Sequence, residues 1–333
     1  MSKIWEKNRL YSFLRPYVDA CTRASYRRLT VSGELPEEGA VIIAPNHTST
    51  LMDALVILQS RKKPTVFGAR ADIFRKPAVA RILRFLRIVP MARLRDGSQS
   101  VLHNLETFVE VDDVLANGVP FCMFAEGRHR PMHSLLPVGK GIARIAFASA
   151  RERQTYIVPT GIDHGSFFRY RRPCKVTFGE PVDVNAFLQA HEHDSEAETY
   201  QEFRRVLFRR ISSLITYLPD DENYEARWEE IRPKRKIRPW LAVLTAPLFL
   251  VAAILCLPMW VAAEVLCRRA KDHAWNNTIR YGVKLLGTPL MLLFWLLVIP
   301  GWWKLLAGLL FLFSYSFFYD WLNLTPSPGI GEE

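Results

Sequence analysis

Residues 40–53 read AVIIAPNHTSTLMD, and this stretch decides the fold of the chain around it. The apolar run at 40–44 predicts a short buried strand that ends at Pro45. The next residues predict a helix over 51–58, preceded by three polar residues that can cap its start, Thr48, Ser49 and Thr50. His47 therefore lies on the turn between a strand end and a helix start, the edge at which α/β domains bind ligands.

A histidine at that edge has two interpretations. With the carboxylate of Asp53 nearby, His47 could take a proton from an alcohol and act as a general base. The alternative is an ordinary turn histidine, with Asp53 facing the solvent. These two residues by themselves leave both interpretations open.

Strand-like and helix-like segments alternate on both sides of this stretch. That alternation predicts an α/β fold with a mostly parallel sheet and helices on both faces. The strands are expected at 29–33, 40–44, 65–68, 88–93, 119–124, 156–162 and 175–182.

Cations follow several of the predicted strands. Arg93 ends one strand, Arg128 follows another, and Lys140 precedes a helix that begins near Gly141. Arginine forks and helix N-termini bind phosphate oxygens, so convergence of these groups near His47 predicts an anionic substrate that presents a hydroxyl. Taken singly, each of them could equally be a solvated surface cation.

Four sequence blocks, spread over residues 40–182, together resemble the glycerolphosphate and lysophosphatidate (1-acylglycerol-3-phosphate) acyltransferase superfamily of the PlsC type. Each block alone is weak, but their order is specific. The blocks are 46–53, then 68–70 with 89–93, then 124–128, and finally 157–161 with 176–181.

The resemblance implies roles for particular residues. His47 would deprotonate the acceptor hydroxyl, which then attacks an acyl thioester, and Asp53 would orient His47. The phosphate site of the acceptor would be shaped by Arg93, Glu126, Gly127 and Arg128, beside the cation Lys140. The acyl donor would be acyl-coenzyme A or acyl-carrier protein. This chemistry needs a base, a positioned alcohol and oxyanion donors, so no metal or cofactor is expected.

Two departures from the family pattern are visible. The usual spacing is His-x4-Asp, whereas five residues separate His47 from Asp53, and the loop must absorb the extra one. The third block usually reads Glu-Gly-Thr-Arg, whereas Arg128 follows Gly127 directly here. The cation that meets the phosphate could therefore be Arg128 or Arg130.

The charge and composition limit the classes of molecule that the protein is expected to bind. The formal net charge is +11, which suits nucleic acid, anionic lipid or small anions. The cations are scattered beside apolar segments without a stacking aromatic motif, so nucleic-acid binding is not expected. Five cysteines without a C-x-x-C pair predict reduced thiols in a cytosol-facing protein. The run His191-Glu192-His193-Asp194 lies in a polar stretch and is not expected to bind metal.

Three regions are expected. Residues 1–30 form a basic amphipathic helical segment for a membrane surface, 31–231 the catalytic α/β domain, and 232–333 apolar membrane-embedded helices. The apolar stretch at 241–267 is long enough to span and has basic flanks on both sides, so it either bends back at its prolines or crosses once. A second stretch, 285–318, is expected to turn at Pro300-Gly301.

The sequence thus predicts an integral membrane acyltransferase whose catalytic domain faces the cytoplasm. It would acylate lysophosphatidate to phosphatidate in phospholipid biosynthesis. Two alternatives stay open. One is a glycerol-3-phosphate acyltransferase that makes lysophosphatidate. The other is a non-catalytic membrane protein that binds or scaffolds lipids with the same fold.

Overall fold

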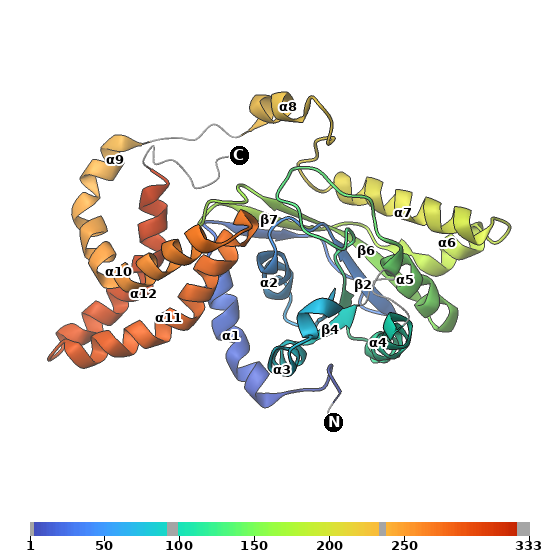
Figure 1. The fold of residues 1–333 in the computed structure, drawn as a ribbon, viewed down its shortest axis with the longest axis horizontal. Coiled ribbons are helices and arrows are strands. Elements are labelled where there is room, and N and C mark those ends of the chain that lie inside the picture. The colour runs from blue at the N-terminus through green and yellow to red at the C-terminus, as the bar shows by residue number, and fades with distance from the viewer. Residues whose placement is uncertain (1–2, 92–98, 233–237, 325–333) are drawn as a thin grey trace.

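The computed structural model describes residues 3–91, 99–232 and 238–324 (Figure 1). Eight strands form a single sheet: β1 (Leu29–Ser32), β2 (Ala40–Pro45), β3 (Val66–Arg70), β4 (Ile88–Met91), β5 (Phe121–Cys122), β6 (Thr155–His164), β7 (Cys174–Phe178) and β8 (Val182–Asp183). The helices of the α/β part are α1 (Arg9–Arg23), α2 (Leu51–Gln59), α3 (Pro77–Phe85), α4 (Gln99–Ala116), α5 (Lys140–Glu152), α6 (Val184–Ala190), α7 (Glu196–Ser212) and α8 (Tyr224–Ile231), with a 3-10 turn, η1 (Ala71–Phe74). The C-terminal helices are α9 (Pro239–Leu244), α10 (Ala246–Arg269), α11 (Asn276–Val298) and α12 (Trp303–Leu322), with the 3-10 turn η3 (His273–Trp275) before α11.

The sheet has the strand order β1-β7-β6-β2-β5-β3-β4, with β8 paired to β6. The five strands from β6 to β4 are parallel to one another, while β7 and β8 run antiparallel to β6. The prediction of a mostly parallel α/β sheet is therefore confirmed. Because β2 lies inside the parallel part, its carboxyl end opens at the sheet edge where ligands bind in such folds.

Strand β2 is buried along its whole length and supplies side chains to two cores. Ala40, Ile42 and Ala44 pack on the face covered by α4, α5 and α7. Val41 and Ile43 pack on the opposite face, which α1 and α2 cover. The period-2 alternation of a strand fixes this division, and helices cover both faces of the sheet (Figure 1).

Helix α1 packs against α2 and α11 and continues through Pro16. Arg15 of this helix donates to the carbonyl oxygens of Leu58 and Arg61, which ties α1 to the end of α2. The opposite face of α1 exposes four large side chains, Leu10, Phe13, Leu14 and Tyr17. Its role at a membrane surface stays a prediction.

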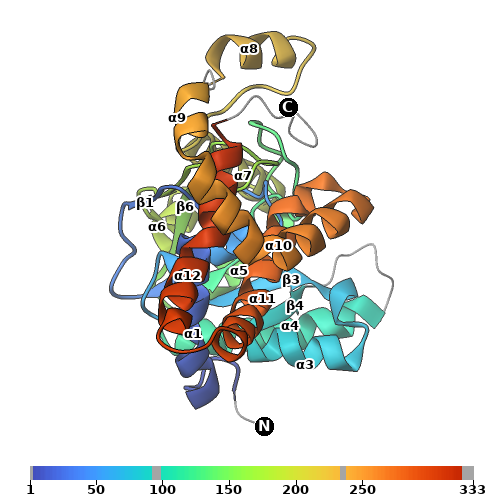
Figure 2. The same ribbon diagram turned by 90° about the vertical axis from the view of Figure 1, so that its left-hand side faces the viewer.

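Helices α10, α11 and α12 pack together on one side of the α/β domain (Figures 1 and 2). Within the described residues, these three segments are long and apolar enough to cross a membrane. Helix α10 continues through Pro258 as one helix, so the chain does not turn back inside this stretch. The predicted turn at Pro300-Gly301 does separate α11 from α12.

The first turns of α11 are polar and buried against the α/β domain. Asn277 donates to the carbonyl oxygen of Phe167 at 2.8 Å, and Arg280 donates to that of Phe168 at 2.8 Å. Both acceptors lie in the connection between β6 and β7. The large exposed apolar side chains of α11 begin only at Leu286. The start of α11 is therefore a docking segment, and the apolar surface suited to lipid lies farther along the helix.

Candidate active site

The loop that carries His47 is fixed to the neighbouring strand by Asn46. The Asn46 side chain donates to the carbonyl oxygen of Ile162 at 3.0 Å and accepts from the Ile162 N–H at 2.7 Å. Asn46 is almost fully buried, so these two bonds replace the water that its amide gives up. The side chain thus continues the β2–β6 pairing past the end of β2 and holds the start of the loop.

His47 and Asp53 meet directly. The His47 Nδ1 atom lies 2.8 Å from Asp53 Oδ2, and the same oxygen accepts the backbone N–H groups of Thr48 and Ser49, each at 2.7 Å. Burial by itself opposes ionisation, but hydrogen bonds from His164 and His47 hold the pKa of Asp53 well below its usual range. A buried, ionised carboxylate therefore orients the imidazole.

The expected capping of the following helix is wrong in its detail. The N-cap residue of α2 is Thr50, and it makes no side-chain capping bond. Asp53, in the first turn, instead accepts the N–H groups of Thr48 and Ser49, which precede the helix, so its carboxylate orders the loop and does not cap α2. One carboxylate thus closes the loop and orients the histidine.

The extra residue between His47 and Asp53 is absorbed at Thr50. This residue has φ 47° and ψ −123°, a backbone conformation that residues other than glycine rarely adopt. Its Oγ1 atom lies 2.7 Å from Oγ1 of Thr278 in α11. The longer loop therefore still brings His47 onto Asp53, and it does so with a contact from the C-terminal helices.

A second histidine that the sequence analysis missed binds the same carboxylate. His164 Nε2 lies 2.7 Å from Asp53 Oδ1, and both side chains are buried. Burial by itself lowers the pKa of His164, but Cys174 and Asp53 raise it well above the usual range. His164 ends β6, next to β2 in the sheet, so a polar residue just after the strand predicted at 156–162 was the available signal.

Glu126 acts on the site through the backbone. Its two carboxylate oxygens accept the N–H of His47 at 2.7 Å and the N–H of Leu136 at 2.8 Å. Burial raises the pKa of Glu126 to about 7. Glu126 thus joins the loop of His47 to the segment after block three, and it can shape an acceptor site by holding this backbone.

The predicted phosphate-binding residues differ in their surroundings. Gly127 has φ +68°, which explains a glycine at this turn. Arg128 and Lys140 are exposed, and Lys140 begins α5. Gly139, the residue before α5, donates its N–H to the carbonyl oxygen of Ala125 at 2.7 Å. Arg130 forms an ion pair with Asp220. Arg93 lies outside the described residues.

The ring of His47 is held on two sides. Phe124 stacks on it at 4.0 Å between ring centroids, and His129 approaches it edge-on at 5.7 Å. Because Nδ1 binds Asp53, the nitrogen left for a substrate is Nε2, which has no hydrogen-bond partner among the described residues. This geometry suits a general base, with a carboxylate on one nitrogen and a reacting hydroxyl on the other.

The region that contains this site is similar to known proteins. A family model described as Acyltransferase matches residues 28–163. These residues form an acyltransferase domain. The resemblance drawn from the four sequence blocks is thereby confirmed, and the matched region contains His47, Asp53 and Glu126.

Two known proteins are similar to parts of the chain. Glycerol-3-phosphate O-acyltransferase 2 of Saccharomyces cerevisiae is 27% identical over 122 residues, which is 36% of this chain and 16% of the yeast protein. The crystal structure of the 1-acyl-sn-glycerophosphate (LPA) acyltransferase PlsC from Thermotoga maritima is similar over 63% of this chain and 83% of that chain, with TM-score 0.45 and 21% identity. The chain thus spans less than a fifth of the length of the yeast relative.

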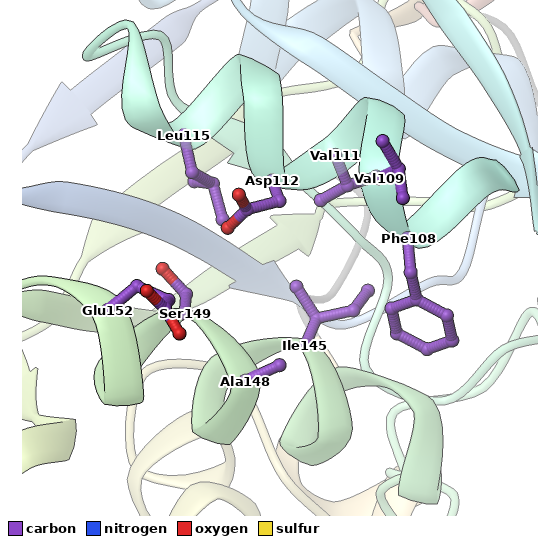
Figure 3. A pocket seen from close by; sticks show the side chains of 9 residues that line it. All are labelled: Phe108, Val109, Val111, Asp112, Leu115, Ile145, Ala148, Ser149 and Glu152. Atoms are coloured by element: carbon purple, nitrogen blue, oxygen red, sulfur yellow. The ribbon is translucent and has the colours of Figure 1, made fainter. Parts of the chain in front are cut away.

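Two surface cavities lie outside the immediate surroundings of His47. One, of about 370 Å³, lies between α4 and α5 and is lined by residues such as Phe108, Ile145 and Glu152 (Figure 3). The other, of about 440 Å³, reaches His164 and His133 from the side of β7. None of the predicted site residues in the described part of the chain lines the first cavity.

The surroundings of the cysteines and of the run at residues 191–194 show whether they could bind a metal ion or form a disulfide. All five cysteines are free and buried, as expected for reduced structural thiols. The ring of His191 stacks on Phe187, and His193 is exposed. Over the described part of the chain, no group of three or more His, Cys, Asp or Glu side chains could hold a metal ion.

Proposed function

We propose that the protein transfers a fatty acyl chain from acyl-coenzyme A or acyl-carrier protein to the hydroxyl of lysophosphatidate, which gives phosphatidate. The observation that carries the proposal is the 2.8 Å contact between His47 Nδ1 and the buried Asp53 within an acyltransferase domain. The contact leaves Nε2 of His47 for the acceptor hydroxyl. It also provides a fixed negative charge that stabilises the imidazolium formed during the reaction.

The reaction has one nucleophile, which is the acceptor itself. His47 Nε2 takes the proton of the acceptor hydroxyl while the oxygen attacks the thioester carbonyl carbon. The tetrahedral intermediate then collapses, so that the new ester C–O bond remains and the C–S bond breaks. The leaving thiolate takes the proton from His47, which restores the neutral base. This sequence calls for no cofactor or metal.

The acceptor is proposed to carry a phosphate, because the exposed cation Arg128 ends the block that contains Glu126, and the exposed Lys140 begins α5, which is joined to this block by the Gly139–Ala125 hydrogen bond. Lysophosphatidate is preferred because the apolar helices α10–α12 would keep the domain at a membrane, where this lipid resides. Glycerol 3-phosphate is the second candidate, and the similarity to a yeast glycerol-3-phosphate acyltransferase favours it.

The three apolar helices associate the protein with a membrane, and we propose that the domain faces the cytoplasm. Arg268 and Arg269 end α10 beside the connection that contacts His129 of the acyltransferase domain, and this basic end supports the orientation. The substitution Gly301→Cys, in the turn between α11 and α12, tests the topology in sealed vesicles. Labelling of the introduced thiol from the cytoplasmic side alone would exclude a hairpin that crosses the bilayer.

The deciding experiment is acyl transfer by the purified protein in detergent. Acyl-coenzyme A is offered with lysophosphatidate or glycerol 3-phosphate, using wild type, His47→Ala and the exposed control His193→Ala. Turnover is expected with lysophosphatidate and should fall by about 1,000-fold in His47→Ala, the size of a general-base contribution. Turnover with glycerol 3-phosphate alone would select the second candidate. Absence of turnover across a wider panel of donors and acceptors would favour the non-catalytic lipid-binding alternative.

A further inference from the structure

The connection between α10 and α11 lies against the active site. Asp272, in this connection, binds His129 of the acyltransferase domain, with 2.9 Å between Asp272 Oδ2 and His129 Nε2. A few residues farther on, Thr278 holds the strained Thr50 of the His47 loop. Two separate contacts thus join the C-terminal helices to the loops on either side of His47.

His129 connects this contact to the base. Its ring meets the ring of His47 edge-on, at 5.7 Å between centroids and an interplanar angle of 76°. Trp275, in the same connection as Asp272, meets His129 perpendicularly at 6.3 Å. Phe124 stacks on the face of His47, so the rings of Phe124 and His129 both contact the ring of His47.

Helix capping does not account for the whole Asp272 contact. Oδ1 of Asp272 accepts the N–H of Ala274 at 2.9 Å and caps η3. A cap needs only one oxygen, and asparagine caps as well as aspartate does. The second oxygen, Oδ2, binds His129. Burial opposes ionisation of Asp272, but the hydrogen bond from His129 keeps the pKa of this carboxyl below its usual range.

We propose that Asp272 is a positioning residue of the active site and acts on His47 through His129. This inference rests on the acyl-transfer function proposed above. The α10–α11 connection then completes the site, so that the base reaches its working position when the C-terminal helices are docked on the acyltransferase domain. Asp272 itself touches neither substrate nor the reacting atoms.

The test separates capping from positioning. In Asp272→Asn the remaining oxygen can still cap η3, but the amide that replaces Oδ2 cannot accept from His129. The expected result is a fall in kcat of about 10-fold, with KM for both substrates unchanged, because His47 is less well placed while substrate contacts persist. Lys271→Ala, in the same connection and exposed, is the matched control and should keep wild-type kinetics.

A second variant tests the same contact from the side of His129, in case Asp272→Asn does not fold. His129→Phe keeps an aromatic ring but has no nitrogen to bind Asp272, and adding Asp272→Asn to it should cost nothing further if the two residues act as a pair. Additive losses would overturn the inference. So would an unchanged kcat in Asp272→Asn, or a raised KM for the acceptor with kcat retained, which would make His129 a binding group.

A measurement that does not depend on turnover completes the experiment. Diethyl pyrocarbonate modifies accessible imidazoles, and the rate at each histidine is read by mass spectrometry of its peptide. Asp272→Asn should raise the rates at His129 and His47, with the exposed His193 as an internal standard. Equal rates in wild type and variant would overturn the inference. Absence of wild-type turnover with normal labelling changes would instead count against the proposed acyl-transfer function.

Discussion

The loop that holds His47 and the segment that holds Arg128 lie side by side, but they are built differently. The His47 loop is locked, because Asn46 makes two hydrogen bonds to the neighbouring strand and Asp53 accepts three from the loop. Glu126 adds a further bond to the N–H of His47. Arg128 and Lys140 are exposed side chains. His47 is therefore preorganised for its proposed role as the base, whereas the two cations proposed to bind the acceptor are open to solvent.

The largest effect in this comparison is expected at Asp53. Asp53→Asn leaves one oxygen where the carboxylate accepts four hydrogen bonds, two of them from histidines. We expect kcat to fall by about 1,000-fold and the free energy of unfolding to fall by about 3 kcal/mol, because a buried charge network loses its centre. Steady-state kinetics and denaturant titration measure the two quantities. Wild-type stability in this variant would show that the loop is not held as described.

His164 is expected to matter less than Asp53 and more than the surface cations. His164→Gln breaks or lengthens the 2.7 Å bond to Asp53 Oδ1 but leaves the His47 contact in place. We expect kcat to fall by about 10-fold at unchanged KM, the size of one hydrogen bond to a charged group. A rise in KM instead would place His164 in substrate binding. His191→Gln is the matched control, since that side chain contacts only its own helix.

Glu126 predicts a pH dependence of stability. Burial raises its pKa from the usual 4.5 to about 7, so between these values the unfolded chain has lost the proton that the folded chain keeps. Stability should therefore decrease as pH rises from about 5 to 7. Glu126→Gln should make the stability depend less on pH in this range. It should also lower kcat by about 10-fold, because one of the two hydrogen bonds that join His47 to Leu136 through this side chain is lost. Denaturant midpoints of both proteins at several pH values measure how stability changes with pH. The same pH dependence in wild type and Glu126→Gln would contradict the prediction.

The smallest effect is expected at the exposed cations. Arg128→Ala should raise KM for a phosphorylated acceptor by about 3-fold, leave kcat and stability unchanged, and reduce the salt dependence of KM. Lys62→Ala, which is also exposed but far from block three in the chain, is the control. A loss of kcat in Arg128→Ala would show that this side chain joins the preorganised half of the site.

Local sequence predicted the parts of the molecule that depend on local patterns. Alternation of strands and helices predicted the α/β class, and residues 40–53 correctly predicted a buried strand, a turn with His47 and a helix. The four blocks identified an acyltransferase domain before any contact was known. These features are encoded in periodicity and in residues close together along the chain.

Tertiary structure decided what His47 touches. The loop conformation at Thr50 lets His47 reach Asp53 in spite of the altered spacing, and that conformation is held by Thr278 from another region. His164 lies 111 residues from Asp53, and Asp272 lies 143 residues from His129. The sequence states which side chains are present, but strand order and helix docking determine which of them meet, because those contacts are made between distant segments of the chain.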